Sequence, residues 1–67
     1  MTLNNSKLLI AMASKCMTTA DLARETGYSL SAIRSYVNKE RKPSTKAVGK
    51  IAKALGVDVT EIIELED

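Results

Sequence analysis

The sequence predicts an all-α fold, a compact domain of five short helices, from three observations. Apolar residues recur at helical spacing in five segments, and no stretch alternates apolar and polar residues for long enough to form a strand. The core must consist of aliphatic and small side chains, because the 67 residues include two Tyr and neither Phe nor Trp. At this length we expect one domain, residues 1–67, near the lower limit for folding without disulfides or a structural metal.

The first two predicted helices span about residues 5–15 and 19–26. The first is predicted from the helical spacing of its apolar residues. The second begins with a capping box, in which the Thr18 side chain accepts a hydrogen bond from a free amide of the first turn. The Asp21 side chain in turn accepts one from the Thr18 backbone amide. It ends at Gly27, where a left-handed backbone causes no side-chain clash.

The third predicted helix, at about residues 30–38, completes a helix-turn-helix over residues 18–38. Ser29 can cap its start. Ala23, four residues before Gly27, is small enough to let two helix backbones cross closely around a tight turn. This spacing is the most specific signal in the chain.

The fourth predicted helix, at about residues 45–55, has the clearest amphipathic pattern. One side carries apolar residues and the other carries lysines. Ser44 can cap its start, and Gly56 closes its end. Because a lysine stripe is more typical of a solvated face than of a contact surface, we assign it no binding role.

The fifth predicted helix, at about residues 59–65, belongs to an acidic C-terminal helix and tail, residues 58–67. Asp58 and Glu61 have the spacing of a second capping box. The segment also holds more apolar side chains than one short helix needs to dock, namely Ile62, Ile63 and Leu65. This excess is a candidate dimer seam.

The third predicted helix leaves one face for contacts outside the domain. With Ile33 and Tyr36 turned to the core, the outward residues are Leu30, Ser31, Arg34 and Ser35. Arg34 can pair with a guanine in a major groove, contact a phosphate, or remain a solvated surface arginine. Leu30 can meet a thymine methyl group or be a tolerated surface leucine.

The charge of the chain is unevenly distributed. Residues 1–57 hold all ten Lys and Arg against three acids, whereas residues 58–67 hold five acids and no base. Such a basic body concentrates a polyanion near it. In the predicted exposed loop 39–43, the cations Lys39, Arg41 and Lys42 can follow a sugar-phosphate backbone, or they can simply solubilise a turn.

The composition argues against an enzyme. The chain has no His and a single Cys, which excludes an internal disulfide, the common zinc patterns and His-based catalysis. We therefore expect no cofactor, no metal site and no small-molecule ligand. Cys16 is expected to be a buried or half-buried apolar residue. The longest apolar stretch, Leu8 to Ala13, is too short to span a bilayer, so we expect a soluble cytoplasmic protein with no membrane partner.

The run from Met17 to Ile63 resembles the λ-repressor-like, XRE-type family of helix-turn-helix regulators, which includes the phage repressor and Cro proteins. The resemblance rests on the frame described above and on two further segments. These are the loop Asn38 with Arg41-Lys42-Pro43-Ser44 and the sequence KIAKALGV at 50–57. The family fold is a compact five-helix domain.

The resemblance implies double-stranded DNA as the partner, with the third helix in the major groove and a homodimer on a two-fold symmetric operator. The four outward residues of the third helix fall on base-contacting positions of the family. Residues on or beside phosphate-contacting positions are Thr18, Thr19, Asn38, Lys39, Arg41 and Lys42.

The chain departs from the family pattern in three places. Thr19 stands where relatives usually have Gln, a residue that touches phosphate. Lys39 stands where Gly usually follows Asn. Met12 and Val37 replace an Arg–Glu pair between the first and third helices, and this joint change avoids a lone buried charge that would cost roughly 3–5 kcal/mol.

Together these observations predict a sequence-specific DNA-binding transcriptional regulator, of Cro or repressor type, from a bacterium, phage or mobile element. The alternative is a protein-interaction module on the same fold, such as an antitoxin or an antagonist of another regulator. DNA binding that weakens steeply with salt separates the first function from the second.

Overall fold

The computed structural model describes residues 2–65, which form four α-helices, one 3-10 turn and two short strands. The helices are α1 (Asn5–Ser14), α2 (Thr19–Thr26), α3 (Leu30–Val37) and α4 (Thr45–Leu55). The other elements are η1 (Val59–Glu61), β1 (Thr2–Leu3) and β2 (Ile63–Glu64). The first four predicted helices are confirmed, each with ends within one residue of the predicted ones.

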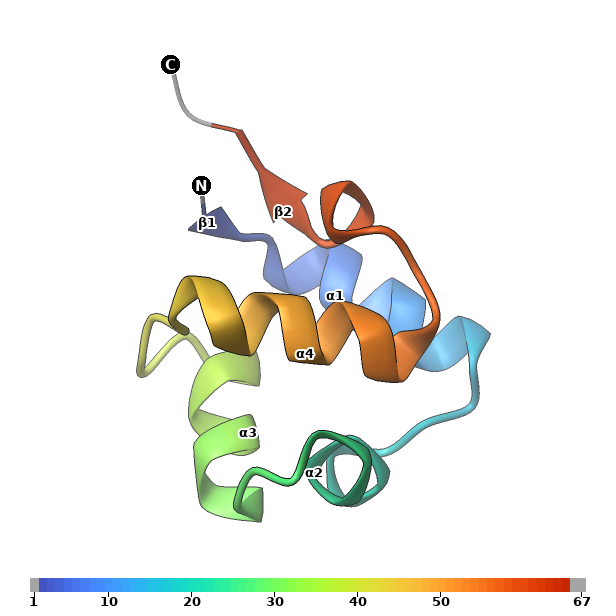
Figure 1. Ribbon diagram of the computed structural model, residues 1–67, viewed down its shortest axis with the longest axis vertical. Coiled ribbons are helices and arrows are strands. Elements are labelled where there is room, and N and C mark those ends of the chain that lie inside the picture. The colour runs from blue at the N-terminus through green and yellow to red at the C-terminus, as the bar shows by residue number, and fades with distance from the viewer. Residues whose placement is uncertain (1, 66–67) are drawn as a thin grey trace.

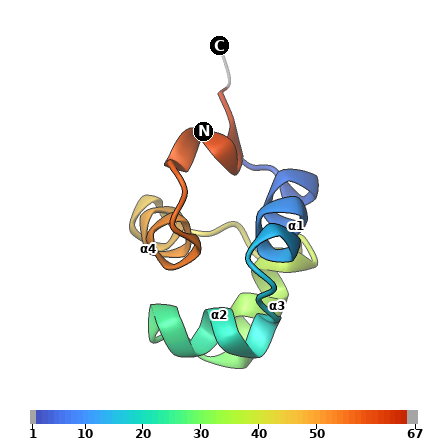
Figure 2. The same ribbon diagram turned by 90° about the vertical axis from the view of Figure 1, so that its right-hand side faces the viewer.

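The helices enclose a single core. α1 and α4 face one another, α2 and α3 close one end of the molecule, and the C-terminal segment closes the other (Figures 1 and 2). Every helix and the C-terminal segment contribute to this core, since the largest fully buried side chains are Leu8, Leu22, Ile33, Ile51, Leu55 and Ile62. The core is therefore aliphatic, as the composition predicts.

The predicted fifth helix is wrong. Asp58 and Glu61 do form the predicted capping box, but it opens only the 3-10 turn η1. The chain then becomes extended, and β2 pairs antiparallel with β1, with Thr2 opposite Glu64 and Leu3 opposite Ile63. A cluster of β-branched residues favours this extended form over a helix, because branching at Cβ restricts side-chain rotamers in helices. Residues 66–67 of the predicted acidic tail lie outside the described residues.

Two helices end on non-glycine residues in the left-handed conformation, at Cys16 (φ 53°) and Lys39 (φ 64°). In each case the backbone amides just past the helix close a Schellman-type turn. After α3, the amide of Lys39 donates to the Tyr36 carbonyl at 3.3 Å, and the amide of Glu40 donates to the Ser35 carbonyl at 2.8 Å. Cys16 is exposed, so its expected burial is wrong.

Candidate nucleic-acid interface

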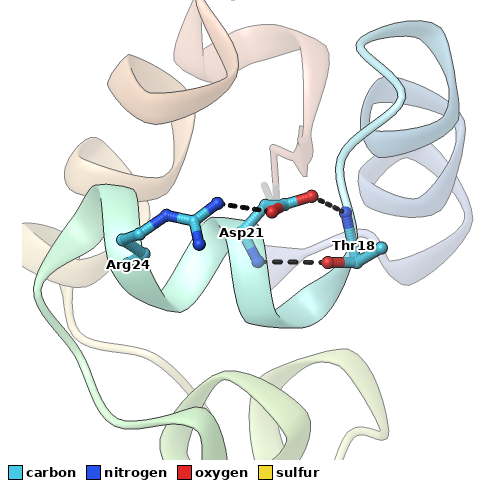
Figure 3. Close-up of polar contacts among 3 residues, drawn as sticks. All are labelled: Thr18, Asp21 and Arg24. Carbon is cyan, nitrogen blue, oxygen red and sulfur yellow. Dashed lines mark hydrogen bonds and ion pairs between the residues drawn. The ribbon is translucent and has the colours of Figure 1, made fainter.

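The start of α2 is fixed by the predicted capping box, shown in Figure 3. The Thr18 amide donates to the Asp21 carboxylate at 2.9 Å, and the Asp21 amide donates to Thr18 Oγ1 at 3.1 Å. The hydrogen bond from the Thr18 amide lowers the pKa of Asp21 below its ordinary value, with the Thr18 side chain and Arg24 adding to the effect.

The turn between α2 and α3 is tight, as the spacing of Ala23 and Gly27 predicts. Gly27 adopts φ 80°, and its amide donates to the Ala23 carbonyl at 2.9 Å. The buried Thr26 hydroxyl donates to the Leu22 carbonyl at 2.8 Å and accepts from the Tyr28 amide at 3.3 Å. These bonds satisfy the polar groups of the turn and fix the crossing of the two helices.

The orientation of α3 agrees with the sequence prediction. Ile33 is fully buried and Tyr36 is 8% exposed, so the opposite side of the helix faces solvent. The candidate base-contacting residues Leu30, Ser31 and Arg34 are exposed, and Ser35 is half-buried. Ser29 caps the helix, accepting a hydrogen bond from the Ala32 amide at 3.1 Å. The four candidate base-contacting residues thus come from one short, capped helix.

Two of these four residues have properties that limit what they can recognise. The Ser35 hydroxyl donates to the Ser31 carbonyl at 2.9 Å, so its oxygen remains as an acceptor for a base amino group. Leu30 is 37% exposed and offers only an apolar surface, which suits a thymine methyl group. Ser31 and Arg34 extend from the same face without such restrictions.

The candidate phosphate-contacting residues lie on both sides of α3 in the sequence. Thr18 is exposed and Thr19 is half-buried, both at the start of α2. The remaining four are exposed and lie at and beyond the C-terminal end of α3, at Asn38, Lys39, Arg41 and Lys42. Arg41 is held against α3, since its guanidinium carbon lies 5.7 Å from the centre of the Tyr36 ring.

The basic loop borders a shallow cleft of about 420 Å³. The residues that line it include Lys39, Arg41 and Lys42, the N-terminal segment 2–6 and Glu64. Sequence reasoning did not identify this cleft or the role of Asn5 within it. The Asn5 amide nitrogen lies 2.9 Å from the Tyr36 carbonyl oxygen and 2.6 Å from that of Val37. No local pattern predicts a bond that spans more than 30 residues of sequence.

A second unpredicted contact involves the lysine stripe of α4. Lys50 Nζ lies 5.3 Å from the centre of the Tyr28 ring. Tyr28 directly precedes Ser29, the residue that caps α3. The contact braces the tight turn from α4, although both residues retain some exposure.

Membrane and metal sites can be checked over the part of the chain that the structure describes. Within residues 2–65, no helix combines the length and apolar character needed to cross a membrane. Nor do any three His, Cys, Asp or Glu side chains among these residues gather closely enough to hold a metal ion.

Solved structures show the same fold. A restriction-modification controller protein, C.AhdI from Aeromonas hydrophila, superposes with a TM-score of 0.80 at 23% identity, covering 85% of this chain and 86% of its own. A hydroxyethylphosphonate dioxygenase mutant superposes with a TM-score of 0.81 at 22% identity over 100% of this chain. The chain spans only 14% of that dioxygenase, so this match shows the fold alone. A comparison with curated proteins gives no match.

The family is shown by the sequence itself. The model of the Cro/C1-type helix-turn-helix DNA-binding domain matches residues 7–67, which include all the helices except the first two residues of α1. The match therefore covers the capped α2, the tight turn and the exposed face of α3 described above. On this evidence the chain belongs to the Cro/C1-type helix-turn-helix DNA-binding domain family.

Proposed function

We propose that this protein is a transcriptional regulator that binds double-stranded DNA at specific sequences, with α3 in the major groove. The observation that carries the proposal is the solvent-facing side of α3, a short helix that is capped at its start and packed from behind through Ile33 and Tyr36. An α-helix fits the width of the major groove, where each base pair presents a distinct pattern of donors and acceptors.

The residues have separate proposed roles. Arg34, Ser31, Ser35 and Leu30 read base edges, with Arg34 as the main determinant because a guanidinium can pair with guanine O6 and N7. The proposed phosphate contacts come from Thr18 and Thr19 on one side, and from Asn38, Lys39, Arg41 and Lys42 on the other. Phosphate contacts on both sides of α3 would fix its register in the groove.

We further propose that the protein acts as a homodimer on a two-fold symmetric operator, as a repressor of Cro type in a bacterium, phage or mobile element. The family relationship supports this proposal. The structural neighbour C.AhdI is itself named a restriction-modification controller, which supports regulation as the role. In such a dimer the two recognition helices would lie about 34 Å apart, one turn of DNA.

The experiment that tests this function is selection of bound fragments from random DNA duplexes, followed by titration of the selected duplex at several salt concentrations. We expect a palindromic consensus and a log–log salt slope of about −0.9 for each phosphate neutralised. A set of selected fragments without any shared sequence would contradict specific recognition. The absence of association with any duplex at low salt would overturn DNA binding itself.

A protein-interaction module on the same fold is the second candidate, and one observation favours it. Leu9 and Ile10 on α1 are 51% and 66% exposed, which is unusual for large apolar side chains next to each other. In that case duplex DNA would not compete with the protein partner, and the salt dependence described above would not be seen on DNA.

A further inference from the structure

The side chain of Asn5 links α1 to the end of the recognition helix. Its Nδ2 atom carries two hydrogens, and it donates to the carbonyls of Tyr36 at 2.9 Å and Val37 at 2.6 Å. Both bonds are partly buried, which makes them stronger than bonds exposed to water. They span 31 and 32 residues of sequence, so they hold two separate elements together.

The carbonyls that Asn5 binds belong to the last turn of α3, where carbonyls lack partners within the helix. The Tyr36 carbonyl also accepts the amide of Lys39, the residue in the left-handed conformation. Asn5 therefore fixes the backbone at the point where the chain leaves α3. The direction of the following basic loop depends on this point.

No ion pair between α1 and α3 supplements this link within residues 2–65. The positions where family members often carry an Arg–Glu pair hold Met12, which is buried, and Val37, which packs against the core. The ion pair between Asp21 and Arg24 lies within α2 and does not connect it to another helix. Apolar packing between helices can slide, whereas two hydrogen bonds from one planar amide define a position.

Asn5 also lines the cleft that Lys39, Arg41 and Lys42 border. We propose that Asn5 is a positioning residue for DNA binding: it fixes the end of α3, and thereby holds the basic loop in the direction that lets its cations reach phosphates. This inference rests on the proposed function. Asn5 itself would make no contact with DNA.

The test compares Asn5→Ala with Ser6→Ala, both in the full chain. Ser6 lies in the same turn of α1 and lines the same cleft, but within the described residues its side chain makes no hydrogen bond to α3. Affinity for the selected duplex and its salt slope are measured at a temperature where circular dichroism shows each variant fully folded. We expect Asn5→Ala to lower affinity about tenfold and to flatten the salt slope by about 1, the effect of losing one phosphate contact, while Ser6→Ala matches the wild type.

A double-mutant cycle with Lys42→Ala provides a readout that a purely structural role would not change. If Asn5 acts through the loop, Asn5→Ala costs less affinity once Lys42 has been removed, so the two losses are less than additive. If Asn5→Ala does not fold, Asn5→Ser keeps one donor at this position, and we expect the same direction of change in slope.

Three results would overturn the inference. The first is a lowered melting temperature for Asn5→Ala with affinity and salt slope unchanged, which would give Asn5 a role in stability alone. The second is strict additivity with Lys42→Ala. The third is an equal loss of affinity in Ser6→Ala, which would show that any change in the lining of the cleft weakens binding. Failure of the wild-type protein to bind any duplex would instead overturn the proposed function, so the two failures are distinguishable.

Discussion

At the scale of single residues, Arg34 offers the sharpest test of sequence recognition, because it is the one cation on the exposed face of α3. We expect Arg34→Ala to lower affinity for the selected operator by about 1–3 kcal/mol and to lower affinity for random DNA much less. Fluorescence anisotropy titrations on both duplexes measure the difference. Equal losses on the two duplexes would reduce Arg34 to a phosphate contact.

Lys39 gives a prediction in which stability and binding change in opposite directions. Its φ of 64° lies in the region where a Cβ atom causes strain. We expect Lys39→Gly to stabilise the fold by about 0.5–1 kcal/mol and to weaken DNA binding, since a cation is lost from the loop. Thermal unfolding and DNA titration of the same sample measure both effects.

Gly56 supplies the matched control for that backbone argument. Gly56 has φ 69°, and a Cβ atom added there would meet no atom closer than Lys15 Nζ at 4.0 Å. Gly56→Ala should therefore destabilise the fold by about 1 kcal/mol through its backbone alone. An unchanged melting temperature for both variants would show that the left-handed positions carry no strain.

Sequence reasoning predicted the hydrogen bonds whose two partners lie close together in the sequence. The caps at Thr18, Ser29 and Ser44 could be read because each bonds an amide three residues later. The two hydrogen bonds from Asn5 to the end of α3 could not be predicted, because their acceptors are brought near Asn5 by the packing of α1 on α3. The left-handed backbone at Lys39 was equally hidden, since Lys is not a residue that signals this conformation.

At the scale of elements, the start of α2 should depend on pH. The pKa of Asp21 is lowered, so its stabilising contribution is complete above the ordinary value of 3.8 and is lost as pH falls through the lowered pKa. We expect Asp21→Asn to unfold at a lower temperature at neutral pH and to lose less stability on acidification. Circular dichroism melts from about pH 7 to about pH 2 test this expectation.

The control for this experiment is Glu25→Gln, which removes another acid of α2 outside the capping box. It should leave the acid-induced loss of stability unchanged. The second box will contribute a background in both variants, because the hydrogen bond from the Thr60 amide likewise lowers the pKa of Asp58. An identical acid response in Asp21→Asn and the wild type would contradict the role of the carboxylate at the helix start.

The C-terminal element shows where local patterns were insufficient. A capping box indicates how a helical turn begins, but it does not determine how far the turn continues. Here Ile62 and Ile63 are consecutive and both buried. The backbone amide of Asn4 donates to the Ile62 carbonyl at 2.8 Å, so the segment around Ile62 is held by the residues that precede α1. Strands of two residues are too short to produce a readable alternation.

At the scale of the whole molecule, burial separates the apolar residues of this segment into two groups. Ile62 is fully buried, whereas Leu65 is 79% exposed. We expect Ile62→Ala to destabilise the fold by about 2–5 kcal/mol, because it removes contacts and leaves a cavity, and Leu65→Ala to change stability by less than about 0.5 kcal/mol. Chemical denaturation at fixed protein concentration measures both.

Of the three residues predicted as a dimer seam, Leu65 alone remains accessible to a second copy. A marked loss of stability in Leu65→Ala that shrinks as the protein is diluted would indicate that Leu65 lies in a subunit contact, because dilution separates the subunits of the wild type as well. A small loss in Ile62→Ala would contradict the core assignment.

The pairing of β1 with β2 also determines when the chain can fold during its synthesis. α2 and α3 are complete once residue 37 has been made, yet the core then still lacks α4, Ile62 and Ile63. A nascent chain therefore leaves Leu3 and Leu8 uncovered until residue 63 has left the ribosome. The part of the core that contains Leu3, Ile62 and Ile63 is complete only at that late moment, so we expect incomplete translation products to be substrates for proteases.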